Sequence, residues 1–252
     1  MRFLIIHQLD NPSAEAMAAE AALIKTMLRD DPVVVQSDVL LSSSRLHQQM
    51  PAARLEVTQT HAPVVLDPWT DTAEYTRSFL QIDVPDHEAA LAWAQQWPAS
   101  HVDSVVEVRA VGCPGGVHSV SGDIPADAKA DTEHFMVIIH EESLLSEGTV
   151  PPQSVLDGME RYNIESVESG ILLAGHGLHP SPDGARVKFT AGKASVIDGP
   201  FSESKELIAG YWLIQTKSKQ EAIEWAKNYP FPVFNSATIS VLPVVGLEHK
   251  HV

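Results

Sequence analysis

The stretch VIDGPFSESKE, residues 196–206, brings together the side chains of this chain that best fit acid–base chemistry. Asp198 precedes a Gly-Pro pair, and a cluster of alternating charge follows it: Glu203, Lys205 and Glu206. A lysine among carboxylates can hold one of them ionised, and a carboxylate can orient a histidine as a general base. We therefore predict that Asp198 is catalytic and that the three charged residues after it line a ligand-binding cleft.

A structural interpretation of Asp198 stays open beside the catalytic one. An aspartate before Gly-Pro can accept hydrogen bonds from the backbone amides ahead of it, glycine permits unusual φ, and proline fixes φ. These three residues alone would form a sharp corner that has no part in any reaction.

Two histidines are candidates for the partner of Asp198. His140 ends the apolar run FMVIIH, and His176 lies in the glycine-rich stretch GHGLHP. Histidine is the side chain most suited to proton transfer near neutral pH. The chain has 12 histidines, but their spacing gives no metal signature such as H-E-x-x-H. We predict an Asp–His pair without a metal or other cofactor, and the sequence leaves open which histidine takes part.

Two further residues are candidate ligand contacts. Arg186 can pair with a carboxylate of the protein or bind an anion. Tyr211 and Trp212 are neighbours on an expected strand, so their side chains point to opposite sides of the sheet. One of them joins the core and the other can form a pocket wall. We include Arg186 and Tyr211 among the ligand-binding candidates.

Composition narrows the class of partner. The formal net charge of −16 disfavours direct binding to nucleic acid or to an anionic membrane, because both need clustered Lys and Arg. No apolar run approaches the roughly 18 residues of a membrane span, and the apolar start of the chain is too short for a signal-peptide core. The single cysteine, Cys113, excludes an intrachain disulfide. We predict a cytoplasmic protein that takes a small-molecule ligand.

The chain contains an internal repeat. When it is shifted by 132 positions, residues 19–98 align with residues 151–230 without a gap, and about one quarter of the aligned positions are identical. At the ends a shift of 133 extends the match, which makes His7 the expected counterpart of His140. The segment between the halves is rich in Gly, Pro, Ser, Ala and Asp, as linkers are. We predict a first unit at 1–111, a linker at 112–132, a second unit at 133–246 and a tail at 247–252.

The second unit is predicted to follow the order β-α-β, then a β-hairpin, then β-α-β, because β-rich runs and amphipathic helical patterns alternate along it. Strands are expected within 135–142, 169–180, 207–216 and 237–245, a hairpin at 185–198, and helices at 151–163 and 217–230. Ser218 is the expected N-cap of the second helix, and Pro230 ends it.

Without the hairpin, this order is the split βαβ arrangement of ferredoxin-like domains. Helices then cover one face of an antiparallel sheet and leave the other face bare. Two units in one chain can bury these bare faces against each other, as the subunits of a symmetric dimer do. We predict an α+β fold of two tandem ferredoxin-like units, each with an inserted hairpin, packed sheet to sheet as a pseudo-dimeric α+β barrel. Further pairing into a homodimer stays open.

Residues 190–230 resemble the DGPF branch of the YCII-related family. The resemblance is carried by Asp-Gly-Pro-Phe at 198–201, Ser-Lys-Glu at 204–206, Gly210-Tyr211 and the A-x-x-W-A pattern at 222–226. The first half resembles the family only through the repeat. The resemblance implies a dimeric α+β barrel and, from some YCII-type relatives, a His–Asp pair in a cleft at the barrel. DGPF proteins are often encoded beside alternative sigma factors, which implies a regulatory setting.

The two halves differ at the DGPF passage itself. In the first half the glycine is lost, Ala73 stands in place of Lys205, and Ser78-Phe79 stand in place of Gly210-Tyr211. A corner needed only for folding should survive in both halves, because both must fold. The loss favours a chemical or binding role for the second half alone.

Three functions fit these observations. The first is a cofactor-independent lyase or isomerase of a small metabolite, and the second is a non-catalytic protein that binds or senses a small ligand. The third is a regulatory protein that contacts an alternative sigma factor. A histidine within hydrogen-bond reach of Asp198 or Glu206 in a partly buried cleft would favour catalysis, whereas a polar-lined cleft without such a pair would favour binding.

Overall fold

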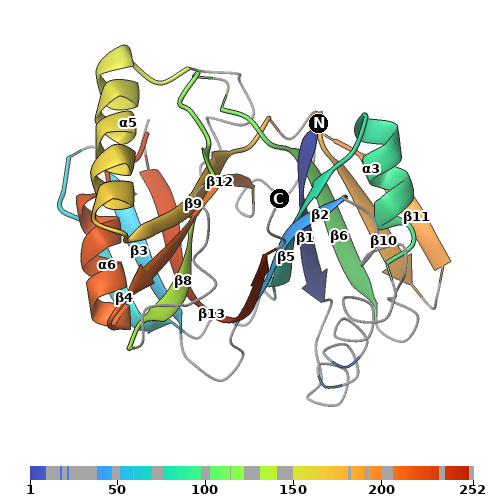
Figure 1. Cartoon of the computed structure of the whole chain (residues 1–252), viewed down its shortest axis with the longest axis horizontal. Coiled ribbons are helices and arrows are strands. Elements are labelled where there is room, and N and C mark those ends of the chain that lie inside the picture. The colour runs from blue at the N-terminus through green and yellow to red at the C-terminus, as the bar shows by residue number, and fades with distance from the viewer. Residues whose placement is uncertain are drawn as a thin grey trace.

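The fold is described from a computed structural model of the whole chain (Figure 1). The residues that the structure describes are 1–9, 18, 22, 39–46, 52–58, 60–69, 76–97, 103–113, 115–121, 131–140, 150–180, 183–190, 193–199, 207–232 and 236–249. No helix within these ranges is long and apolar enough to cross a membrane.

The described strands of both halves follow the same order, and α3 of the first half corresponds to α6 of the second. The first half contributes β1 (Arg2–Leu9), β2 (Leu40–Leu46), β3 (Ala52–Thr58), β4 (Val64–Trp69), β5 (Thr76–Asp83), α3 (His87–Ala94) and β6 (Ser104–Ala110). The second half contributes β8 (Glu133–His140), α5 (Gln153–Glu168), β9 (Leu172–Gly177), β10 (Ala185–Thr190), β11 (Lys193–Asp198), β12 (Ile208–Thr216), α6 (Lys219–Asn228) and β13 (Ser236–His249). Between them lies the short strand β7 (Val120–Ser121). The order predicted for the second half is confirmed.

The N-cap predicted for α6 is also confirmed. Ser218 has an extended backbone, and its side chain accepts a hydrogen bond from the amide of Glu221, 3.3 Å away. Asp86 caps α3 in the same way, accepting from the amide of Ala89 at 2.9 Å. These caps satisfy backbone donors that a helix leaves unpaired at its start.

Each half forms a four-stranded antiparallel sheet in the ferredoxin-like order. The strands run β6-β1-β5-β2 in the first half and β13-β8-β12-β9 in the second. In both, the last strand of the unit lies beside the first, as the split βαβ arrangement requires. The predicted fold class is therefore confirmed: two tandem ferredoxin-like units, each with an extra hairpin.

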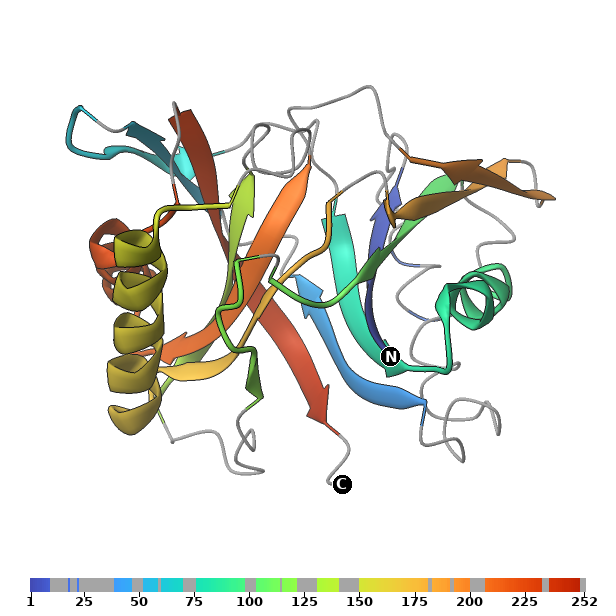
Figure 2. The ribbon, with the colours of Figure 1, turned by 90° about the horizontal axis from the view of Figure 1, so that it is seen from above.

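The two hairpins are exchanged between the units. Strand β3 of the first half pairs with β13 of the second, and β10 of the second half pairs with β6 of the first. Figure 2 shows the cyan hairpin β3–β4 beside the red β13 and the orange hairpin β10–β11 beside the green β6. The registers match, because Ala53 faces Val241 just as Ala185 faces Val108. This exchange was not predicted from the sequence.

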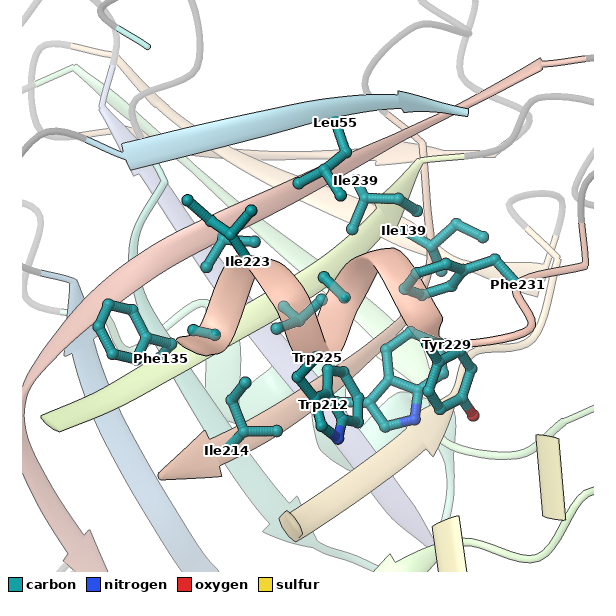
Figure 3. Packing of buried hydrophobic residues seen from close by; sticks show 14 of the residues in the cluster. Leu55, Phe135, Ile139, Trp212, Ile214, Ile223, Trp225, Tyr229, Phe231 and Ile239 are labelled. Atoms are coloured by element: carbon teal, nitrogen blue, oxygen red, sulfur yellow. The ribbon is translucent and has the colours of Figure 1, made fainter. Parts of the chain in front are cut away.

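Three apolar clusters divide the molecule into layers. One lies between α5, α6 and the sheet of the second unit (Figure 3), and a second lies between α3 and the sheet of the first unit. The third lies between the two sheets and draws Leu4, Ile6 and Phe79 from the first half and Met136, Ile138 and Tyr211 from the second. Helices thus stand on the two outer sides, and the bare sheet faces bury each other as predicted.

The inner cluster has a symmetric centre. The rings of Phe79 and Tyr211 stack with their centroids 6.3 Å apart and their planes 20° apart. These two residues occupy matching places in the repeat, so a pseudo-twofold axis relates the units near this contact.

The predicted equivalence of His7 and His140 is wrong by one residue. Ile5 lies in the cluster under α3 and Val137 in the cluster under α5 and α6, so a shift of 132, and not 133, matches the faces of β1 and β8. Because side chains alternate along a strand, the one-residue difference sends the two histidines to opposite faces. His7 stacks on Trp97 on the helix side, whereas His140 Nε2 lies 3.3 Å from Ser240 Oγ inside the barrel.

Candidate functional site

A pocket opens on the helix-covered side of the second unit. Its walls come from α5, from the strands β9 and β12, and from the segment that connects the two halves. We call it the linker pocket; it is defined by Cys113, Val117, Leu156, Met159, Trp212 and Tyr229, with the glycines and Asn163 described below. Its volume is about 70 Å³, which at roughly 10–15 Å³ per water-sized group leaves room for about five to seven such groups.

Three glycines form the floor of the linker pocket. Gly175 and Gly177 alternate along β9, and Gly210 faces Gly177 across the pair β9–β12, so all three present the same face of the sheet. A Cβ atom on Gly177 would lie 2.9 Å from the Cβ of Cys113. Only glycine therefore lets the connecting segment lie this close to the sheet.

The same floor in the first half carries side chains. The residues that match the three glycines are Ser43, Arg45 and Ser78. Ser43 and Ser78 are buried there. His7, which stacks on Trp97 with ring centroids 5.0 Å apart, takes the place that Ile139 has in the wall of the linker pocket. The pocket floor is thus a feature of the second unit.

Asn163 anchors the polar part of the linker pocket. Its Oδ1 accepts hydrogen bonds from the Tyr229 hydroxyl at 2.9 Å and from Trp212 Nε1 at 3.3 Å. Indole nitrogen can only donate, so the atom that faces Trp212 is the oxygen and the amide orientation is fixed. Burial raises the pKa of Tyr229, which keeps its hydroxyl protonated as a donor.

Asp198 lies away from this pocket. It is the last residue of β11, the outer strand of the exchanged hairpin, and it is exposed to solvent. Among the described residues its carboxylate forms no hydrogen bond or ion pair. The neighbouring Gly199 donates from its amide to the carbonyl of Gly184 at 3.0 Å, which closes the hairpin end. Glu203, Lys205 and Glu206 lie outside the described residues.

His176 is among the residues that line the linker pocket, but its imidazole ring points into the barrel. Its neighbours Gly175 and Gly177 face the pocket, so the side chain between them faces the inner cluster. There its Nε2 lies 3.5 Å from Gln81 Nε2 and its ring 5.4 Å from that of Tyr211. Burial, and secondly the positive charge of Arg2, lower the pKa of His176 to about 4. The structure thus pairs Asp198 with neither His176 nor His140 within the ranges it describes.

Tyr211 and Trp212 face opposite sides of β12, as predicted. Tyr211 belongs to the inner cluster and Trp212 to the cluster under the helices. Trp212 is therefore the member of the pair that lines the linker pocket, whereas Tyr211, the one predicted to bind ligand, packs in the barrel.

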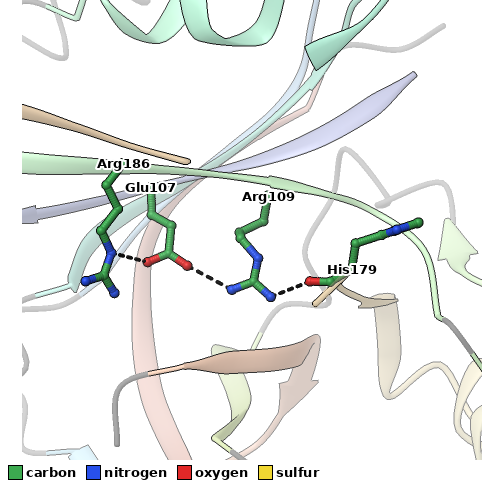
Figure 4. A network of polar contacts seen from close by, with 4 residues as sticks. All are labelled: Glu107, Arg109, His179 and Arg186. Carbon is green, nitrogen blue, oxygen red and sulfur yellow. Dashed lines mark hydrogen bonds and ion pairs between the residues drawn. The ribbon is translucent and has the colours of Figure 1, made fainter. Parts of the chain in front are cut away.

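Arg186 belongs to a buried network that joins the two units (Figure 4). Its Nε donates to Glu107 Oε2 at 3.0 Å, and the other oxygen of Glu107 accepts from Arg109 Nη1 at 2.9 Å. Arg109, fully buried, also donates from Nη2 to the carbonyl of His179. The chain of contacts crosses from the second unit to the first and back, so it ties the exchanged hairpin to its host sheet.

The first half has a different contact at the matching place. Arg54 faces Ser240 in the pair β3–β13, where Arg186 faces Glu107 in the pair β10–β6. Its Nη2 donates to Thr238 Oγ1 at 3.3 Å, and its guanidinium lies 4.9 Å from the centre of the Trp69 ring. The sequence predicts that Arg186 and its counterpart Arg54 each pair with a carboxylate. Arg186 does so, whereas Arg54 contacts no carboxylate among the residues that the structure describes.

The residues that build the linker pocket were not predicted from the sequence. Asn163 lies in a helix among other polar residues, and Cys113 lies in a segment identified only as a linker. The one available signal was the alternation of glycines at 175 and 177, since glycine inside a strand marks a close approach by another part of the chain.

Comparison with known proteins gives a match to both halves of the chain. A family model described as "YCII-related domain" matches residues 1–112 and 135–246. An uncharacterized protein of Rhizobium meliloti (strain 1021) is 39% identical over 76 residues, which cover 30% of this chain and 61% of that protein.

The Glu107 network predicts a large loss of stability in Glu107→Gln. The change removes the negative charge that Glu107 places between two guanidinium groups, and breaking such a network costs about 3 kcal/mol or more. We expect this fall in the free energy of unfolding, measured by urea titration. Glu160→Gln is the control: Glu160 pairs with the exposed His118 at 3.0 Å, and its loss should cost less than about 1 kcal/mol. Equal losses in the two variants would contradict the role given to Glu107.

The environment of His176 predicts a pH dependence of stability. The unfolded chain takes up a proton at this side chain near its usual pKa of 6.5, whereas the folded chain does so only near 4. The contribution of His176 is therefore complete above pH 6.5 and is lost as the pH falls towards 4. Between pH 7 and pH 5 it amounts to about 2 kcal/mol.

Urea titrations at the two pH values test this expectation. His176→Gln should remove about that part of the pH dependence, whereas His118→Gln, which replaces an exposed ring, should leave the wild-type dependence in place. An unchanged pH dependence in His176→Gln would show that the side chain is not buried in the neutral form.

Proposed function

The chain belongs to the YCII-related family through both of its halves, and from this premise we propose that it binds a small molecule in the linker pocket of its second unit. The observation that supports this most is the glycine floor under a mostly apolar wall. A concave apolar site with a few fixed polar groups is the usual form of a small-molecule site. Here those groups are the amide of Asn163, the hydroxyl of Tyr229 and the thiol of Cys113.

The difference between the halves supports a single site. Three positions that are glycine in the second unit carry side chains in the first, and a buried histidine stacks on Trp97 where the second unit has Ile139. Both units need their barrel faces for the fold, but only the second has glycine at the three floor positions. Divergence of one copy after duplication accounts for this pattern without cost to the fold.

Catalysis by Asp198 with His140 or His176 is the alternative proposal. Proton transfer requires the acid and the base to reach one substrate at hydrogen-bond distance. Asp198 stands exposed on the outer strand of a hairpin, whereas both histidines are buried inside the barrel. These placements favour binding over a cofactor-independent lyase or isomerase. A contact with an alternative sigma factor stays a prediction that rests on the family setting alone.

A ligand screen with two variants at Cys113 tests the proposed function. Cys113→Trp would place an indole in the linker pocket, and Cys113→Ser would change the thiol with little change in volume. A ligand present at one hundred times its Kd stabilises the folded chain by about 2.7 kcal/mol, which raises Tm by several degrees. We expect the screen to find a metabolite that raises the Tm of the wild-type chain and of Cys113→Ser but leaves the Tm of Cys113→Trp unchanged.

Two results would count against binding in this pocket. The first is a ligand that stabilises Cys113→Trp as much as wild type, since that ligand must bind elsewhere. The second is a broad metabolite library in which no compound separates Cys113→Ser from Cys113→Trp.

A further inference from the structure

The linker pocket also indicates what kind of ligand it takes. Resting on the function proposed above, we propose that the ligand is a small neutral molecule with a carbonyl-type oxygen, and that the side-chain amide of Asn163 donates a hydrogen bond to that oxygen. Three features of the pocket support this ligand class: the orientation of Asn163, the lack of charge in the wall and the shape of the floor.

Asn163 has a donor left over. Its oxygen already accepts from Tyr229 and Trp212, so the Nδ2 group, with two hydrogens, is the part of the amide that remains. The residue is only 6% exposed, and no described residue accepts a hydrogen bond from Nδ2. Asn163 lines the linker pocket, so an oxygen in the pocket can satisfy the donor. A ligand that fills the pocket without supplying an acceptor would cut this donor off from water and leave it unpaired, which is costly, so the site prefers molecules that supply an acceptor.

The wall of the linker pocket carries no charge that could pair with an ionised ligand. Among the described residues that line it there is no Asp, Glu, Lys or Arg. The titratable side chain at its rim, His118, is 87% exposed and directed to Glu160 at 3.0 Å. A charged ligand would lose its hydration here without gaining a counter-charge, which is strongly unfavourable. A neutral ligand loses far less.

The floor favours a small, compact molecule. A Cβ atom on Gly175 would lie 2.9 Å from Cδ1 of Trp212, so glycine there lets the indole approach the strand closely and form part of the wall. With Leu156 and Met159 on the opposite side, the space between floor and helix suits a compact apolar body. A ring ketone of about six heavy atoms matches both the volume and the single donor.

Three probes of similar size separate these features. Cyclopentanone is neutral and has the oxygen; methylenecyclopentane has =CH2 in its place; cyclobutanecarboxylate has a negative charge. Cys113 is the chain's single cysteine and lines the linker pocket, so occupancy should slow its alkylation by N-ethylmaleimide, followed by intact mass. We expect cyclopentanone to protect Cys113 at concentrations at least about fivefold lower than methylenecyclopentane, and cyclobutanecarboxylate to give no protection.

Asn163→Asp is the matched variant. Aspartate keeps an oxygen for Tyr229 and Trp212 but has no amide hydrogens, so the advantage of cyclopentanone over methylenecyclopentane should fall to about onefold. If the variant does not fold, the comparison of the three probes on the wild-type chain decides the proposal alone.

The outcomes distinguish this inference from the function on which it rests. Equal protection of the wild-type chain by cyclopentanone and methylenecyclopentane overturns the role of Asn163, although the linker pocket then still binds small molecules. If cyclobutanecarboxylate protects Cys113 more strongly than the two neutral probes do, the proposal that the ligand is neutral is wrong. If no probe protects Cys113 while a compound from the metabolite screen does, the ligand class is wrong and the binding function stands. Failure of both the probes and the screen removes the binding function itself.

Discussion

An antiparallel sheet with helices on one side has a second, apolar face that water must not reach, and the rest of this molecule depends on how that face is buried. Here the two halves of one chain bury each other's faces. Leu4, Ile6 and Phe79 meet Met136, Ile138 and Tyr211 across the barrel. The exchanged hairpins add to this mutual dependence, because each sheet is extended by a hairpin from the other half. Neither unit therefore completes its own sheet.

Duplication separates two demands that a single unit would have to meet together. Both copies must keep the inner face apolar, and they do. Only one copy must keep a floor of glycines beneath the connecting segment, and the second copy has kept it at 175, 177 and 210. The Glu107 network shows the same division: its carboxylate lies in the first half, and its arginine partner on the hairpin, Arg186, comes from the second.

The sequence predicted the elements and their order well, for reasons that are local. Apolar periodicity, the Ser218 cap and the helix stop at Pro230 act within a few residues, so the helices and strands of the second half could be placed directly. Exchange of the hairpins is not local: β6 and β13 are similar strands, and nothing in the composition of β10 selects one over the other. The predicted equivalence of His7 and His140 was wrong because a shift of one residue along a strand moves a side chain to the opposite face.

The site was predicted less well than the fold. Asp198 and the histidines were chosen by residue type, but type does not say on which side of a sheet a residue lies. The linker pocket depends on Asn163, whose amide is oriented by two partners far away in the sequence, Trp212 and Tyr229. Charged clusters are visible in a sequence, whereas a neutral pocket assembled from glycines and a connecting segment is not.

The exchange of hairpins is the central structural claim, and nuclear Overhauser effects between backbone protons test it most directly. The two possible pairings use equivalent registers, so they differ only in which strands meet. The structure predicts cross-strand contacts between Ala185 and Val108 and between Ala53 and Val241. Contacts between Ala53 and Val108 and between Ala185 and Val241 would show that each unit keeps its own hairpin, and would contradict the account.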